Sequence, residues 1–351
     1  MLSVITLADS EKWDQIVHLF DNFDVYYLSG YVKAFMLHGD GEPLLFFYEG
    51  DSIKGINVVM KRDVANDVHF QGKIPNDTYY DFATPYGYGG WLIQGEGDKN
   101  LLFEAYKSWC VDNGIISEFV RFHPVLENHI YSENNYEVIG LGETVAMDLT
   151  SPDVIWQNIT SKNRNMIRKA EKNNVSIYNG RNPWLYEVFR EIYNATMDKD
   201  NAEEYYYFDS KFYKSVLEDL PNNAQIFYAR LDDGEIIAAS IMIAANGRMN
   251  YHLSGSRKEF QHLAPTNLLL YKAALWGCEN GYKTLYLGGG VGSGEDSLFK
   301  FKRAFYRGNP YRFYIGKTIY IHDKYEELLS IRLIEDKSVE QTSFFPKYRM
   351  R

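Results

Sequence analysis

The pattern of hydrophobic and polar positions changes several times between Tyr251 and Phe305. A strand-like run, YHLSGS, precedes a helical run that ends at Asn280-Gly281. A second strand-like run, TLYLGGG, leads through its glycines into the helical segment DSLFKFKRAF. This order of strand, helix, strand and glycine turn predicts a crossover unit of an α/β sheet. The turn suits a phosphate or an oxyanion, which favours acyl transfer as the chemistry.

The same pattern occurs earlier in the chain. An ungapped alignment pairs three features of the two segments: Leu101-Leu102 with Leu268-Leu269, Trp109 with Trp276, and Asn113-Gly114 with Asn280-Gly281. Each helical run ends at Asn-Gly, a suitable C-terminal cap because glycine tolerates positive φ. Upstream of each helix, PLLFFYEGDSIKGINVVM and AQIFYARLDDGEIIAASIMI both read as strand, polar turn and strand. We therefore predict a duplicated α/β domain.

The predicted boundary between the two domains lies near residue 150, where Ser151-Pro152 interrupts a strand-like run. We expect residues 1–150 to form the first domain. The second domain is expected to comprise residues 151–321.

Composition and charge narrow the class of protein. The 351 residues suffice for two domains, and 45% of them are hydrophobic. A net charge of −10 argues against a general nucleic-acid binder but leaves room for a local basic site. The chain has two cysteines, no signal-like N-terminal segment and no apolar run long enough to span a bilayer. These features predict a cytoplasmic protein with no integral membrane association.

Basic side chains cluster at two places in the second half. Arg164 and Arg168 are four residues apart on one face of a predicted helix. They could bind phosphate oxygens or form a solvated basic face. Lys300 and Lys302 follow the glycines at 288–290, where a lysine can neutralise an oxyanion or a phosphate, or simply face water.

The first half offers fewer candidates. His123, in VRFHP, lies at the predicted carboxyl end of a strand, a usual place for active groups in open α/β sheets. It could act as a base, orient a substrate or serve as a structural histidine. The loop DFATPYGYGG contains Asp81 and Tyr86 and could be a substrate-facing lid or a tight connection. We add Arg121 and Tyr251 as candidates for substrate binding.

Several familiar motifs are missing from the sequence. It contains no GxxxxGK[ST] loop, HExxH, CxxC pair, GxGxxG fingerprint or GxSxG elbow. Nucleoside triphosphate hydrolysis, zinc chemistry, nicotinamide chemistry and serine hydrolysis therefore lose support, and we expect no metal site.

Together these segments resemble the Fem family of peptidoglycan interpeptide-bridge aminoacyltransferases and, more broadly, the related tandem GNAT-fold acyltransferases. The resemblance covers most of the chain and is carried by SKNRNMIRKAEKNNV, YHLSGS, TLYLGGG, FKFKRAF, PYGYGG and RFHP. It implies two GNAT-like α/β domains, the first completed by residues 322–351. It also implies transfer of an acyl group, typically aminoacyl from charged tRNA. The acceptor would be an amine on a muropeptide or nucleotide-linked precursor.

The resemblance also implies roles for particular residues. Lys302 matches the lysine of the family's Phe-Lys motif near the reacting ester. Arg164 and Arg168 fall in the basic segment that would meet substrate phosphates. Many Fem enzymes have an acidic residue before a proline where this chain has His123-Pro124, so the general base is not carried over. The long helical hairpin that some members use to hold tRNA is missing too, as it is in shorter members.

Two other hypotheses stay open beside that of a Fem-like aminoacyltransferase. The first is an acetyl-CoA-dependent GNAT N-acetyltransferase acting on an amino sugar or another envelope metabolite. The second is a duplicated, non-catalytic binding module. GNAT domains cradle pyrophosphate with a glycine-containing loop, and the corresponding stretch here, RKEFQHLAPT, has no glycine. No tightly bound cofactor is expected, and the acyl donor is either aminoacyl-tRNA or acyl-CoA. The sequence leaves open the oligomeric state, the acyl group and the acceptor.

Overall fold

The computed structural model describes residues 1–350, and the chain forms two compact units. The first unit comprises Met1–Leu141 and Phe313–Arg351, and the second comprises Gly142–Arg312. Strands β7 (Glu137–Asp148) and β13 (Tyr311–Ile319) each include residues of both units, so the chain passes from one unit to the other within strands. Both limits lie nine residues before those expected from the sequence, at 141 instead of 150 and at 312 instead of 321.

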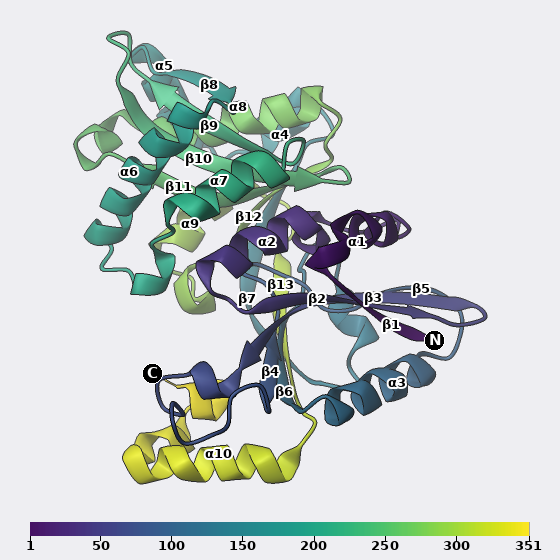
Figure 1. Cartoon of the computed structure of the whole chain (residues 1–351). Coiled ribbons are helices and arrows are strands. Elements are labelled where there is room, and N and C mark those ends of the chain that lie inside the picture. The colour runs from purple at the N-terminus through teal and green to yellow at the C-terminus, as the bar shows by residue number, and fades with distance from the viewer. Residues whose placement is uncertain (351) are drawn as a thin grey trace. The chain divides into compact units, whose positions relative to one another are not determined.

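The sheet of the first unit has the strand order β1-β2-β3-β4-β6-β13, and β5 pairs with β3 (Figure 1). The strands are β1 (Leu2–Thr6), β2 (Glu42–Glu49), β3 (Ile53–Asp63), β4 (Tyr80–Ala83), β5 (Leu92–Gly95) and β6 (Ile115–Arg121). Neighbouring strands are antiparallel except for β4 and β6, which are parallel. The helix between β4 and β6 is therefore a crossover helix.

The α-helices of the first unit are α1 (Ser10–Val17), α2 (Ser29–His38), α3 (Lys99–Asp112) and α10 (His322–Glu335). The crossover helix α3 is capped by Asp98, whose side chain accepts a hydrogen bond from Asn100 N at 2.9 Å. Its apolar residues, among them Leu102 and Cys110, join a core with the strands.

The sheet of the second unit has the order β7-β12-β11-β10-β9-β8. Its further strands are β8 (Ser176–Gly180), β9 (Ala224–Arg230), β10 (Ile236–Ala245), β11 (Arg248–Ser256) and β12 (Thr284–Gly288). Here β11 and β12 form the parallel pair, and the other neighbours are antiparallel.

The α-helices of the second unit are α4 (Pro152–Asn158), α5 (Ser161–Lys172), α6 (Pro183–Lys199), α7 (Ser210–Asp219), α8 (Pro265–Glu279) and α9 (Ser297–Arg303). Helix α6 packs directly on β11, because a Cβ at Gly255 would lie 2.8 Å from Ile192 O. Helix α8 packs on the opposite face, where Gly277 faces Met249 and Leu149. The core on that face includes α4, α5 and α9 residues.

Short 3-10 helices connect these elements. They are η1 (Leu7–Asp9), η2 (Val25–Tyr27), η3 (Val64–Asn66), η4 (Asn128–Tyr131), η5 (Glu204–Tyr206), η6 (Lys258–Leu263), η7 (Val291–Ser293), η8 (Lys337–Gln341) and η9 (Lys347–Arg349).

The structure confirms several features of the predicted repeat. Helices α3 and α8 both end at Asn-Gly, and Gly114 and Gly281 adopt positive φ of 70° and 80°. Each predicted hairpin is an antiparallel pair, β2–β3 in the first unit and β9–β10 in the second. Ser151 caps α4 and Pro152 occupies its first turn, which explains why the strand-like run stops there. Both cysteines are free thiols in helices; Cys110 is buried and Cys278 is half-buried.

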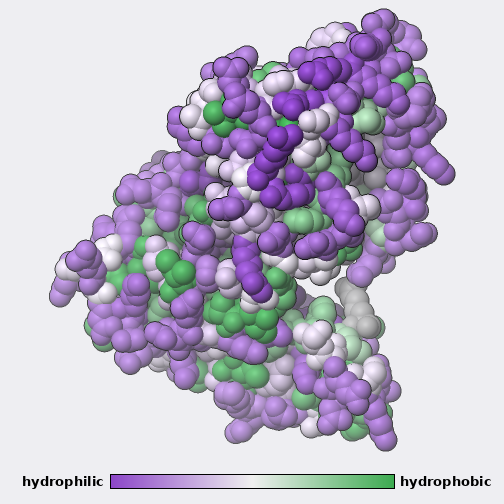
Figure 2. Space-filling view, turned by 180° about the vertical axis from the view of Figure 1, so that it is seen from behind, coloured by the Kyte–Doolittle hydropathy of each residue, from purple (hydrophilic) through white to green (hydrophobic). Residues whose placement is uncertain are grey.

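The visible surfaces of the two units differ in character. Figure 2 shows a mostly hydrophilic face on the second unit, whereas hydrophobic residues gather on the visible face of the first unit. Among the described residues, no helix is both long enough and apolar enough to cross a membrane.

Candidate functional site

A lysine at the carboxyl end of β12 is the most distinctive polar group of the second unit. Lys302, on α9, is half-buried and its Nζ donates a hydrogen bond to Gly289 O at 2.7 Å. Burial lowers the pKa of Lys302 from 10.5 to about 8, against the opposing effect of the nearby Asp296 carboxylate. Because the lowered pKa remains above neutrality, the side chain is mainly an ammonium at pH 7. A cation at a strand end beside a glycine turn can stabilise a developing oxyanion.

The glycine turn has little room for side chains. Gly288 adopts φ of 81°, and a Cβ there would lie 3.4 Å from Lys302 Nζ. A Cβ at Gly289 would lie 2.9 Å from Glu143 O, and one at Gly290 would lie 2.2 Å from Gly294 O. The glycines therefore allow the backbone to approach both its neighbours and the lysine.

Strands β11 and β12 pair only near their amino ends. The parallel register joins Arg248–Asn250 to 284–286, whereas β11 continues to Ser256 along β10. A β-bulge lies at His252, where the register with β10 shifts, and burial lowers the pKa of His252 to about 3. In the part of the chain that the structure describes, the carboxyl half of β11 is thus paired on one side only. Such diverging strands can hydrogen-bond an extended ligand between them.

The predicted basic face lies on α5. Arg164 is half-buried and Arg168 is exposed, and their guanidinium carbons lie 5.7 and 5.2 Å from the ring centre of Trp156. Arg164 also donates to Ser161 Oγ at 3.2 Å, and Arg168 donates to Asn165 Oδ1 at 3.3 Å. Stacking on one indole holds both guanidinium groups on the same side of the helix, where they can bind phosphate.

The two other candidates of the second unit lie in different surroundings. Lys300 is exposed on α9. Tyr251 lies on β11, is half-buried against the core on the α8 face, and has its pKa raised by burial to about 12. Its hydroxyl is therefore a neutral donor at physiological pH.

In the first unit, His123 is fully enclosed. Its Nε2 lies 3.0 Å from Asp24 Oδ2, and its Nδ1 accepts from Leu126 N at 3.3 Å. Because Nδ1 accepts, we assign the proton to Nε2, which donates to Asp24. Asn128 Oδ1 also accepts from the His123 backbone N–H at 2.9 Å. Both ring nitrogens are thus engaged within the unit, which favours an orienting role over that of a base.

The loop with PYGYGG is anchored by buried polar side chains. Tyr31 donates to Tyr86 O at 2.5 Å, and Tyr27 donates to Gly90 O at 2.8 Å. Asn128 Nδ2 donates to Gly89 O at 2.9 Å. The Tyr86 ring is half-buried and stacks on Phe35, with ring centres 5.3 Å apart. The geometry is that of a fixed connection. Arg121 is exposed at the end of β6.

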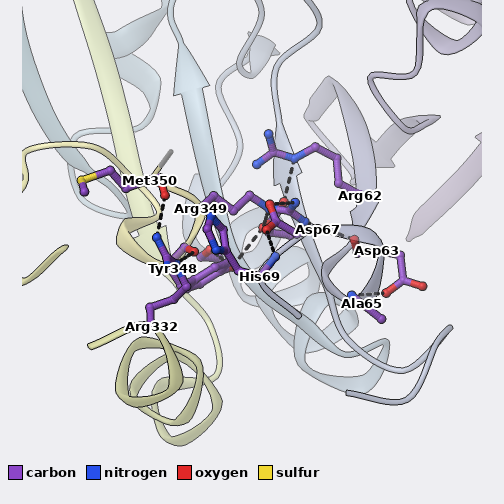
Figure 3. Close-up of polar contacts among 11 residues, drawn as sticks. Arg62, Asp63, Ala65, Asp67, His69, Arg332, Tyr348, Arg349 and Met350 are labelled. Carbon is purple, nitrogen blue, oxygen red and sulfur yellow. Dashed lines mark hydrogen bonds and ion pairs between the residues drawn. The ribbon is translucent and has the colours of Figure 1, made fainter. Parts of the chain in front are cut away.

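Asp81 is fully buried in an ionic cluster of the first unit. Figure 3 shows its partners Arg62, Tyr348 and Arg349. Its carboxylate accepts from Arg62 Nε at 2.7 Å, from Tyr348 Oη at 3.0 Å and from Arg349 Nε. Burial acts to raise the pKa of Asp81, but Arg349 and Arg62 outweigh it, so the pKa falls below its ordinary value. Arg349 also pairs with Asp67 at 3.2 Å. These contacts tie the C-terminal segment to β3 and β4 and favour a structural role for Asp81.

Two residues that the sequence did not single out complete these sites. Asp24 contacts His123 although the two are 99 residues apart in the sequence, and no local pattern marks Asp24. Asp296 caps α9 and also contacts the glycine turn. Its position before the SLF segment, as an N-cap aspartate, was a usable signal. Within residues 1–350, no cluster of His, Cys, Asp and Glu could hold a metal ion.

A comparison with known protein families finds a match within the second unit. Residues 161–303 match a family model described as an acetyltransferase (GNAT) domain. The chain has a tandem GNAT fold. The GNAT domain implies transferase activity, specifically acyl transfer. A search of curated proteins found no significant match.

Solved structures share this fold along most of the chain. FemX is 14% identical, covers 93% of this chain and 99% of its own length, and has a TM-score of 0.67. L-PGS from Bacillus licheniformis is 16% identical, covers 88% and 91%, and has a TM-score of 0.56. The C-terminal domain of a putative lysylphosphatidylglycerol synthetase from Agrobacterium fabrum is 14% identical, covers 95% and 96%, and has a TM-score of 0.56. At these identities the likeness establishes the fold.

Proposed function

We propose that this protein is a cytoplasmic Fem-like N-acyltransferase. It transfers an activated acyl group, aminoacyl by preference, to an amine of a cell-wall precursor such as a muropeptide or nucleotide sugar. The observation that carries the proposal is the Lys302 ammonium, held 2.7 Å from Gly289 O beside the diverging ends of β11 and β12. The tandem GNAT fold and the motifs shared with the Fem family support it.

The reaction needs no covalent enzyme intermediate. The neutral acceptor amine attacks the donor carbonyl, the C–O or C–S bond to the leaving group breaks, and the amine proton passes to the leaving group or to water. An activated ester or thioester requires mainly alignment of the reactants and stabilisation of the oxyanion. Lys302 supplies the positive charge, and Tyr251 and Lys300 are proposed to contact the substrate nearby.

The start of α8 bears on the choice of donor. Ala264 precedes the helix in a left-handed conformation, and Pro265 occupies its first turn without an N–H group. The preceding residues form the 3-10 helix η6. CoA-binding GNAT domains cradle pyrophosphate with a run of free backbone N–H groups at the start of a helix. The geometry at the start of α8 does not favour such a run. Arg164 and Arg168 offer phosphate-binding cations instead, so we propose aminoacyl-tRNA as the donor.

For the first unit we propose supporting roles. Arg121 and Tyr86 are candidates for contact with the acceptor. His123 orients the loop at the end of β6 through Asp24, and Asp81 holds the C-terminal segment.

A donor and acceptor panel tests the proposal. The full chain is incubated with charged tRNA or acetyl-CoA as donor and with UDP-MurNAc-pentapeptide or UDP-sugars as acceptor, while transfer and thermal stabilisation are recorded. Transfer from charged tRNA to the muropeptide, lost in Lys302→Ala and kept in the exposed α7 variant Lys211→Ala, is the expected result. Transfer from acetyl-CoA alone would establish the acetyltransferase alternative. Ligand binding without any transfer would indicate a binding module and overturn the proposal.

A further inference from the structure

The carboxylate of Asp296 joins two segments of the second unit. Its Oδ1 accepts from Phe299 N at 2.8 Å, which caps α9, and its Oδ2 accepts from Val291 N at 3.2 Å, at the start of η7. Gly290 lies against the same carboxylate, because a Cβ there would be 2.4 Å from Oδ1. One side chain therefore fixes the glycine turn to the helix that carries Lys302.

The aspartate caps of α3 and α7 act only on their own helices. Asp209 accepts from Lys211 N and Phe212 N, both in the first turn of α7. Asp98 accepts from Asn100 N at the start of α3. Asp296 differs because its second oxygen reaches back to the turn before its helix. Capping alone does not account for that contact.

The position of the lysine depends on this link. Lys302 Nζ is held by Gly289 O, and Gly289 is adjacent to the glycine that packs on Asp296. The Asp296 charge also acts on Lys302, favouring the ammonium against the effect of burial. Hydrogen bonds from Phe299 and Val291 lower the pKa of Asp296 itself, so it is an anion at neutral pH.

We infer that Asp296 is a positioning residue for Lys302: it holds the turn that supplies the lysine's hydrogen-bond acceptor and keeps the amine a cation rather than a nucleophile. This inference rests on the proposed function for the catalytic importance of Lys302. The geometric and electrostatic link between the two side chains is independent of the substrate. A neutral amine at that place would compete with the acceptor for the acyl group, with loss of the activating charge.

Competitive acetylation measures the effect of Asp296 on the protonation of Lys302 without any substrate. The full chain is labelled with trace acetic anhydride across a pH series, and the extent of reaction at Lys302 is read by peptide mass spectrometry. Exposed Lys300, on the same helix, is the internal reference. In Asp296→Asn, which keeps a capping side chain but removes the charge, we expect the Lys302 labelling midpoint to fall by about one pH unit. Turnover should fall about tenfold at neutral pH.

The matched control is Glu295→Gln, which removes the same charge from the neighbouring exposed residue. We expect it to leave the Lys302 midpoint and turnover unchanged. Equal shifts in both variants, or no shift in Asp296→Asn, would overturn the inference. Asp296→Glu should partly restore the midpoint, which a purely structural role in capping would not produce. A shifted midpoint together with full transfer by Lys302→Ala would support the link and reject the proposed function.

Discussion

The two crossover units share one topology and differ in what lies at the ends of their parallel strands. In the first unit, β4 and β6 pair from Tyr80 to Ala83, and Gly89 and Phe122 extend the pairing by a parallel bridge. In the second unit, the pairing of β11 with β12 stops at Asn250. The first unit thus has its parallel strands joined beyond the strand ends, whereas the second has them diverging beside a glycine turn and Lys302.

The two units also differ in the polarity of a buried residue at corresponding positions of β6 and β12. In the first unit, the buried Glu118 accepts hydrogen bonds from Tyr320, Tyr136 and Tyr106 at 2.6, 2.8 and 3.1 Å, and from Asn57 at 3.1 Å. In the ungapped alignment of the repeats, Glu118 corresponds to the apolar, buried Leu285. A buried carboxylate that is saturated with donors specifies an arrangement more strictly than an apolar residue does.

This contrast teaches that two units with the same topology can surround their charged side chains differently. Buried ionisable side chains of the first unit contact partners within that unit, as Asp24 contacts His123 and Asp81 contacts Arg349. In the second unit, Lys302 has a backbone carbonyl partner and a lowered pKa. We therefore expect substitutions in the first unit to affect mainly stability and those near Lys302 to affect mainly turnover.

The largest effect is expected for Lys302→Ala, which should lower turnover at least about a hundredfold because the oxyanion loses its cation. Stability should change little, since burial of the ammonium is unfavourable. In the wild type, turnover should fall as pH rises through about 8, where the ammonium is lost. Rates and unfolding curves of the wild type and Lys302→Ala are compared, with exposed Lys211→Ala on α7 as control. A pH profile that is flat through this range would remove the charge-stabilising role.

Arg349→Met should have the next largest effect, a loss of about 3 kcal/mol in the free energy of unfolding, because Asp81 loses a buried partner. The lowered pKa of Asp81 stabilises the folded state at pH values above 3.8, and this contribution is lost as pH falls through the folded-state pKa. The difference between wild type and variant should therefore shrink in acid. Urea denaturation measures it, and exposed Arg312→Met is the control. Equal losses in both variants would contradict the ionic cluster's role.

Glu118→Gln should cost about 1–2 kcal/mol of stability, because one of the tyrosine hydroxyls loses its acceptor. Burial raises the pKa of Glu118, so this group favours folding below pH 4.5 and loses that contribution as pH rises toward its folded-state pKa. As pH rises from 4.5 toward the folded-state pKa, the free energy of unfolding of the wild type should therefore fall relative to that of the variant. Denaturant titrations at several pH values test this, with exposed Glu104→Gln as the matched change on α3.

The smallest effect is expected for Arg168→Ala on the proposed RNA donor. Loss of one exposed phosphate contact should weaken binding a few-fold and reduce the salt dependence by about one counterion. Binding to uncharged tRNA is measured across a salt series, with Lys211→Ala on α7 as control. An unchanged salt dependence would indicate that the α5 face does not contact phosphates.

Local patterns in the sequence determined the order of elements in both units. The Asn-Gly helix ends, the two hairpins and the glycine turn before α9 depend on residues close in sequence, and all of them occur as predicted. Lys302 was identified as a candidate for the same reason, because the turn and the helix that carries the lysine are adjacent in the chain.

The tertiary structure alone decided the partners and the charge states. Asp81 meets Arg349 from the other end of the chain, and His123 meets Asp24, although no spacing in the sequence links them. The lowered pKa of Lys302 follows from burial, which depends on how α9 packs against the sheet. Periodicity and capping are local properties of the chain, whereas desolvation and ion pairing depend on which distant segments the fold brings together.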